Sequence, residues 1–194
     1  MVVSKVRRLR FEKEEQEGRK LTYDTLQQET GLAPNTLARF LKNEIGELTR
    51  NNVRLEVIGQ IYRLPENVQE HLRKSIATLS KNNGLTLIMA LSYGGRTEIV
   101  EAVRNIAAKV KAGKLEAAEI DEQVFSQHLY THKWSDPDLL IRTSGEMRLS
   151  NFLLWQISYA ELVVVPTFWP DFRKPQFYEA IEEYARRHRR FGGV

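Results

Sequence analysis

Residues 138–165 read DLLIRTSGEMRLSNFLLWQISYAELVVV, and this stretch alone predicts the class of fold. Asp138–Arg142 has three apolar residues at its centre and is typical of a short strand, and Leu162–Val165 is a wholly apolar run of similar length. Ser150–Tyr159 lies between them and is long enough for a helix. Two strands joined by a helix predict a βαβ unit, because parallel strands need a crossover of this kind.

The same alternation of strands and helices extends in both directions from this stretch. Further strands are expected at Val53–Gly59 and Leu85–Leu91, where apolar and β-branched residues gather. Further helices are expected at Pro65–Asn82, Thr97–Ala112, Glu122–Leu129 and Lys174–Arg190. We therefore predict an α/β domain over residues 51–194, built on a parallel sheet with helices on both faces.

The first fifty residues differ from the rest, and we expect them to form an all-α segment. Residues 1–45 resemble a helix-turn-helix, in which Asn35, Thr36 and Arg39 would face a DNA groove. The positions that would pack its two helices together are Leu26, Gly31, Leu32, Leu37 and Phe40. Ten Lys/Arg against eight Asp/Glu leave this segment about +2, so any DNA binding is expected to be weak. Alternatively, the segment is simply structural.

Composition bounds the remaining possibilities. The chain has 194 residues, is 42% hydrophobic and carries a net charge of +4, which permits an anionic partner without identifying one. It contains no cysteine, which excludes disulfides and thiolate chemistry. No apolar run approaches the roughly 20 residues of a membrane span, and the N-terminus lacks the pattern of a signal peptide. We expect a cytoplasmic protein whose association with membranes is peripheral at most.

Two strand ends carry residues suited to ligand binding, and ligands of parallel α/β sheets bind beyond the carboxyl ends of strands. Residues 142–150 hold two arginines, three hydroxyl side chains and a glycine, just before a predicted helix. Guanidinium groups and a helix N-terminus both favour a phosphate-bearing ligand. The alternative is a surface loop whose arginines pair with Glu146 or Asp138. The second end, Ser92–Arg96, has paired glycines that let backbone approach a ligand, which is a weaker signal.

The stretch Leu139–Leu162 is similar, nearly residue for residue, to the signature of the cis-prenyltransferases that make undecaprenyl diphosphate. Five further motifs occur in the order and spacing of that family: Asn52–Leu55, Asn83–Leu87, Tyr93–Arg96, Trp169–Phe172 and Arg189–Gly193. The resemblance covers residues 51–194, about 144 of the 194. Residues 37–51 also resemble the helix that precedes the first of these motifs in the family.

The resemblance implies a function and a set of site residues. The family condenses isopentenyl diphosphate with an allylic diphosphate, using Mg²⁺. Arg142, Arg148 and Ser150 would hold the diphosphate of isopentenyl diphosphate, and Glu161 would be a Mg²⁺ ligand. Arg190 and Gly192, in the C-terminal tail, would cross a dimer interface into the neighbouring site. The expected partners are a second copy of the chain or a full-length relative.

The sequence also departs from the family. It contains no Asp-Gly-Asn-Gly-Arg loop, whose aspartate binds Mg²⁺ and which cradles the allylic diphosphate, so no catalytic residue is identified. Residues 163–167, VVVPT, replace the usual aromatic and acidic residues. We therefore expect a truncated transferase that is impaired alone or needs a complementing subunit. The alternatives are a DNA-binding regulator or a non-catalytic fusion.

Overall fold

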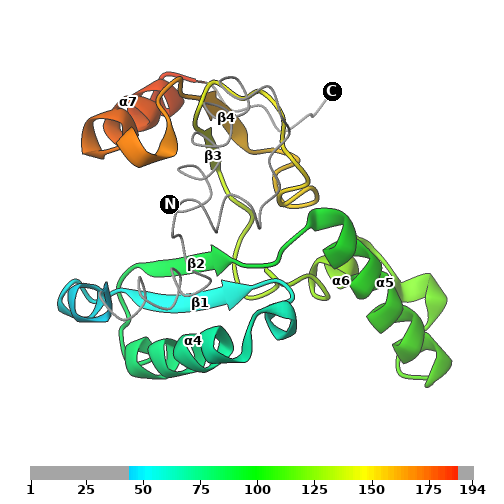
Figure 1. Ribbon diagram of the computed structural model, residues 1–194. Helices are drawn as coiled ribbons and strands as arrows, with labels where there is room; N and C mark the ends of the chain where they lie inside the picture. Colours follow the sequence, from blue (N-terminus) through cyan, green and yellow to red (C-terminus); the bar gives the residue numbers. More distant parts are fainter. Residues whose placement is uncertain (1–43, 188–194) are drawn as a thin grey trace, which may run out of the picture.

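The computed structural model describes residues 44–187 (Figure 1). The helices expected in residues 1–43, the helix-turn-helix residues among them, lie outside this range, as do Arg190 and Gly192. Residues 44–50 are helical and lead into the first described strand. No helix within the described range is both long and apolar enough to cross a membrane.

Within the described residues, four strands form two parallel pairs. β1 (Arg54–Ile58) pairs with β2 (Thr86–Ala90), and β3 (Leu139–Arg142) pairs with β4 (Glu161–Val164). The predicted α/β class with parallel strands is confirmed. The prediction of one continuous sheet is not met within residues 44–187, where no ladder joins the two pairs. The sequence pattern shows which segments are extended, but tertiary contacts decide which edges meet.

The first pair packs against α4 (Glu66–Leu79). This helix follows Pro65, whose fixed φ suits the chain entering a helix, and it buries one stripe of side chains. Spacings of three and four residues place that stripe on one face, toward β1. The buried core consists of Leu55, Val68, Leu72 and Leu79, with Leu48 of the preceding helical residues packed against it. Burial of such side chains stabilises by about 1.5–3 kcal/mol each.

The second pair packs against α7 (Lys174–Ala185), which closes the described chain (Figure 1). Val163, Val165 and Ala180 form the buried centre of this contact, and Leu139 and Ile141 pack around it. Because side chains alternate along a strand, Leu140 and Arg142 point to the opposite face of β3. One face of the pair is therefore used mainly for packing, and Leu140 and Arg142 on the other face line the site described below, where Ile141 also contributes.

The other regular elements between residues 54 and 187 are α5 (Gly95–Lys111), α6 (Glu122–Ser126) and three short 3₁₀ helices. The 3₁₀ helices are η1 (Ile61–Arg63), η2 (Ala117–Glu119) and η3 (Trp169–Asp171). Asp121 begins α6 by accepting a hydrogen bond from the backbone N–H of Val124, as expected of an N-cap.

The predicted helix at Ser150–Tyr159 is wrong. This segment is a series of turns in which Ser150, Asn151 and Leu153 have φ values of 51°, 64° and 44°. Positive φ values are incompatible with a right-handed helix. The reason lies in tertiary contacts. Asn151 and Gln156 form hydrogen bonds with residues of α5, and these contacts hold the segment in a non-helical conformation.

Candidate anion-binding site

A cavity of about 210 Å³ lies on the face of β3 that α7 leaves open. Arg142, Glu146 and Arg148 supply its charged groups. Its apolar walls come from Leu140, Ile141, Met147, Leu149, Phe152 and Leu162. The structure thus brings two of the three predicted diphosphate-binding residues to one cavity at the carboxyl end of a strand.

Arg142 is the last residue of β3, and its guanidinium group is poorly satisfied. Its Nη2 donates to Ser150 Oγ at 3.4 Å, which joins the third predicted residue to the site. Within residues 44–187, its buried Nε has no hydrogen-bond partner. A buried donor without an acceptor costs about 1–3 kcal/mol. Such a group is typically explained by a ligand, an ion or water.

Arg148 lies on the rim of the same cavity and forms an ion pair with Glu146. Its side chain is 55% exposed, whereas that of Glu146 is 25% exposed, so the arginine end of the pair is open to solvent and to a competing anion. The alternative that a loop arginine pairs with Glu146 therefore holds for Arg148 as the loop stands. An incoming anion would compete with Glu146 for one exposed guanidinium group.

The loop between Arg142 and Ser150 is fixed by backbone hydrogen bonds. The N–H of Ser144 donates to Thr167 O and that of Gly145 to Val165 O, both at 2.9 Å. Ser144 and Gly145 have φ values of 69° and 63°, so the turn depends on conformations that a serine adopts only under constraint. The residues that follow β4, Val165 and Thr167, thus hold the loop in place through their backbone carbonyls.

The start of α5 supports the site from the other side. Asn151 O accepts from the N–H of Gly95 at 2.8 Å, and Asn151 Oδ1 accepts from the N–H of Arg96 at 2.9 Å. A Cβ on Gly95 would come within 2.9 Å of Leu154 Cγ, so only glycine fits this approach. The sequence predicted a close backbone approach at these glycines, but what approaches them is the 150–156 segment. The helix N-terminus beside the site belongs to α5.

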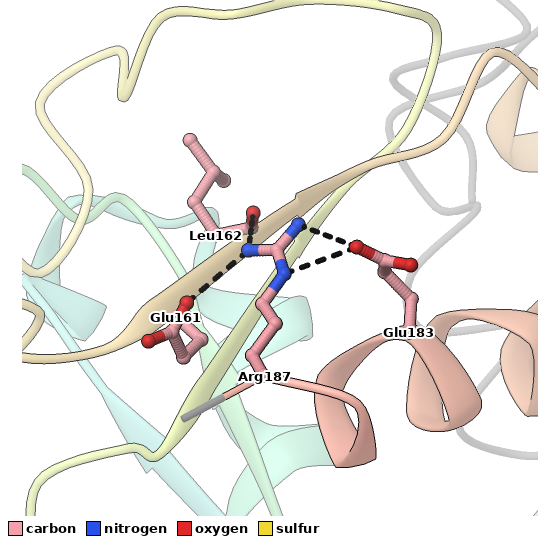
Figure 2. A network of polar contacts seen from close by, with 4 residues as sticks. All are labelled: Glu161, Leu162, Glu183 and Arg187. Atoms are coloured by element: carbon pink, nitrogen blue, oxygen red, sulfur yellow. Dashed lines mark hydrogen bonds and ion pairs between the residues drawn. The ribbon is translucent and has the colours of Figure 1, made fainter. Parts of the chain in front are cut away.

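Glu161, the predicted Mg²⁺ ligand, does not line this cavity. It pairs in register with Leu139, whereas Arg142 pairs with Val164, so the two side chains lie three residues apart along the ladder. At about 3.3 Å per residue, this is about 10 Å. Figure 2 shows that the Glu161 carboxylate instead accepts from Arg187 Nη1 at 3.2 Å. That guanidinium group also contacts Leu162 O and Glu183.

Glu146 is the carboxylate that lines the cavity of Arg142 within residues 44–187, and it is paired with Arg148. Magnesium prefers oxygen ligands in octahedral geometry, and usually binds through carboxylates together with substrate phosphates. Within the described range, no three acidic, histidine or cysteine side chains gather in a way that could hold a metal. The role of Glu161 as a Mg²⁺ ligand stays a prediction, and no chemical step is derived from it.

The sequence reasoning missed a buried network beneath the site. Glu98, in the first turn of α5, is 1% exposed and accepts from Tyr93 Oη, the backbone N–H of Tyr130 and Gln156 Nε2. Glu101, one turn later, accepts from Gln60 Nε2 and from the phenol of Tyr130. Burial, and then the hydrogen bond to Glu98, raise the pKa of Tyr93 above its usual range. A glutamate three residues after a Gly-Gly pair was the available signal.

Three comparisons place the chain among known proteins. A family model described as putative undecaprenyl diphosphate synthase matches residues 24–192. The match begins within the segment that resembles a helix-turn-helix and continues through both expected parts of the chain. It therefore extends the resemblance on the N-terminal side of residue 51.

Curated relatives include an isoprenyl transferase of Chlorobaculum tepidum, which is 47% identical over 156 residues, 80% of this chain and 59% of the relative. The (2E,6E)-farnesyl-diphosphate specific ditrans,polycis-undecaprenyl-diphosphate synthase of Escherichia coli K12 is 49% identical over 154 residues. That match covers 79% of this chain and 61% of the relative. The chain thus spans about three-fifths of the length of these relatives.

Solved structures agree with this placement. Lavandulyl diphosphate synthase from Lavandula x intermedia, solved with dimethylallyl diphosphate, is 39% identical with a TM-score of 0.81, over 86% of this chain and 72% of that one. A probable undecaprenyl diphosphate synthase from Campylobacter jejuni is 35% identical with a TM-score of 0.72, over 90% and 77%. With the motifs, the fold and the relatives in agreement, this chain belongs to the undecaprenyl diphosphate synthase family of prenyltransferases.

Proposed function

We propose that the chain serves cis-prenyl transfer and binds isopentenyl diphosphate in the cavity between Arg142 and Arg148. The observation that carries the proposal is the Arg142 guanidinium group, whose buried Nε has no partner within residues 44–187. A diphosphate oxygen would supply the acceptor that this donor lacks. Guanidinium groups suit this task because their planar fork matches phosphate oxygens.

The walls of the cavity support the same class of ligand. Leu140, Leu149 and Phe152 line it beside the two arginines. A ligand with a charged diphosphate end and a short hydrocarbon chain would place each end against matching chemistry. Inorganic phosphate would leave the apolar wall unused. The combination of few polar groups with an apolar lining is typical of small-molecule sites.

In this proposal the residues of the chain bind and orient rather than form covalent intermediates. Arg142, Arg148 and Ser150 would hold the diphosphate, which fixes the homoallylic double bond of the same molecule relative to an allylic partner. Such positioning converts an encounter of two molecules into a step between prearranged groups. Positive charge near the site would also stabilise a departing pyrophosphate.

Transfer requires more than this site. The sequence contains no Asp-Gly-Asn-Gly-Arg loop, whose aspartate would bind Mg²⁺ beside the allylic diphosphate according to the family resemblance, and Glu161 does not line the cavity. We therefore infer that the chain transfers prenyl groups only with a full-length relative as the complementing subunit, because a second copy of the chain lacks the same loop. A cytoplasmic location and contributions of Arg190 and Gly192 across the interface belong to the same proposal.

A pyrophosphate-release assay tests this function. The chain is incubated with farnesyl diphosphate, isopentenyl diphosphate and Mg²⁺, alone and with an equal amount of a full-length relative. We expect no release by the chain alone, and more release by the mixture than by the relative alone. The excess should disappear when Arg142→Ala replaces the wild type. A mixture that never exceeds the relative alone would contradict the proposed function.

A further inference from the structure

The segment that supplies Ser150 to the site is strained and must be held by its surroundings. Ser150, Asn151 and Leu153 all have positive φ. Non-glycine residues keep such conformations only where neighbouring contacts over-determine them. Two contacts with α5 do this, the Asn151 contacts with the helix start and a hydrogen bond between Gln156 and Glu98.

The second contact is the buried one. Gln156 is 2% exposed. Its amide nitrogen donates two hydrogen bonds, one to Glu98 Oε2 at 3.1 Å and one to Thr131 Oγ1 at 2.9 Å. Glu98 Oε2 also accepts from Tyr93 Oη at 2.5 Å, and its Oε1 accepts from the backbone N–H of Tyr130 at 2.7 Å. Both carboxylate oxygens of Glu98 therefore accept hydrogen bonds. If a glutamine replaced Glu98, its NH₂ group would face one of these donors, and a hydrogen bond would be lost.

We propose that Glu98 is a positioning residue for the diphosphate site, acting through Gln156 on the segment that carries Ser150. The inference rests on the proposed function, because it names what keeps that site in a binding geometry. Glu98 does not line the cavity and touches neither Arg142 nor Arg148. It fixes the far end of the 150–156 segment, while Asn151 fixes the near end against the helix.

Glu101 provides a matched control on the same helix. It lies one turn after Glu98, also shares Tyr130, and accepts from Gln60 at 2.5 Å. Its hydrogen bonds go to Gln60, just before η1, and to Tyr130, rather than to the 150–156 segment. A general loosening of the network would affect Glu101→Gln and Glu98→Gln alike, whereas a positioning role separates them.

The test measures binding of inorganic pyrophosphate by calorimetry to the full chain and its variants, together with the thermal midpoint of each. Glu98→Gln should weaken binding at least about tenfold, the effect expected when a buried donor loses its acceptor. Glu101→Gln should bind within about twofold of wild type, whatever its thermal midpoint. Gln156→Glu should also weaken binding, because it sets two carboxylates together. The swap Glu98→Gln with Gln156→Glu should recover most of the loss, because an amide again faces a carboxylate.

Equal affinity of Glu98→Gln and wild type would overturn the inference, and so would equal losses in Glu98→Gln and Glu101→Gln. If Glu98→Gln does not fold, Gln156→Glu and the swap decide, and a swap no better than Gln156→Glu alone contradicts the positioning role. If wild type does not bind pyrophosphate, the proposed function fails and this inference fails with it. Wild-type binding with unchanged variants would overturn the inference alone.

Discussion

Arg187 and Glu161 form an ion pair at 3.2 Å that joins the end of α7 to the start of β4 across 26 residues of sequence (Figure 2). The same guanidinium group donates to the backbone carbonyl of Leu162 at 2.8 Å and contacts Glu183. Both acidic partners raise the pKa of Arg187 further, through hydrogen bonds first to Glu161 and then to Glu183. This arrangement fastens α7 to the sheet on the side away from the cavity.

We expect Arg187→Ala to lower the thermal midpoint and to speed hydrogen exchange at residues 183–187. The contact to the Leu162 carbonyl and the link to β4 are lost together in this variant. Arg186→Ala is the control, since Arg186 contacts Glu182 in an exposed pair on its own helix. Equal effects of the two variants would show that the link to β4 adds nothing to the hold on α7.

Glu161→Gln should leave the affinity for pyrophosphate unchanged, within about twofold, when Mg²⁺ is absent. The reason is its register, because Glu161 lies opposite Leu139 and not opposite Arg142. The same variant should lower the thermal midpoint, since Arg187 loses a charged partner. Calorimetry and a thermal scan on one preparation check both statements. A loss of affinity as large as that of Arg142→Ala would place Glu161 in the anion site after all.

Gly95→Ala should destabilise the chain by about 1–3 kcal/mol, the usual cost of overpacking. Its Cβ would meet Leu154 Cγ at 2.9 Å and the Leu154 backbone nitrogen at 3.1 Å. Gly46→Ala is the matched substitution, because Gly46 is exposed, lies in the helical residues 44–50 and has only an ordinary contact at 3.7 Å. It should stabilise by about 0.5–1 kcal/mol through helix propensity. Urea unfolding of both variants measures the contrast, and a neutral Gly95→Ala would contradict the close approach.

The half-buried phenols of Tyr93 and Tyr130 predict a loss of stability at alkaline pH. Burial, and then hydrogen bonds to Glu98 and Glu101, raise the pKa values of Tyr93 and Tyr130 above the ordinary 10.0. Above about pH 10 the unfolded chain therefore releases protons that the folded chain keeps, so stability falls as the pH rises. This contribution is fully present below pH 10. Tyr93→Phe should flatten the decline, whereas Tyr178→Phe, which removes an exposed phenol, should not. Parallel curves for wild type and Tyr93→Phe would refute the assignment.

The helices and strands were largely predictable from the sequence, whereas the tertiary contacts between them were not. The strands β1 to β3 and the helices α4 and α7 fall within the predicted segments, because periodicity reports burial directly. β4 begins one residue, and α5 two residues, before the predicted start. The helix predicted at residues 150–159 was wrong because tertiary contacts, which a local pattern does not report, decide the conformation there. The composition of these residues suits a helix, but Asn151 and Gln156 spend their polar groups on α5, and a local pattern cannot show a partner more than 50 residues away.

Some residues of the candidate site were likewise predictable from the sequence, and others were not. Arg142, Arg148 and Ser150 were predictable because they follow one strand and lie within nine residues. Glu98 was not, since a glutamate in the first turn of a helix is ordinarily a solvated residue that favours the dipole. Only its burial distinguishes it. Whether Glu161 reaches the site depends on the register between β3 and β4, and the sequences of the two strands do not determine that register.

The central claim is that Arg142 binds the diphosphate of isopentenyl diphosphate, and calorimetric titration of that ligand tests it most directly. Wild type, Arg142→Ala and Arg104→Ala are compared, Arg104 being an exposed arginine of α5 that does not line the cavity. Charge-assisted hydrogen bonds are worth roughly 1.5–3 kcal/mol, so Arg142→Ala should bind at least about tenfold more weakly. Arg104→Ala should match wild type. Equal affinities of wild type and Arg142→Ala would contradict the claim.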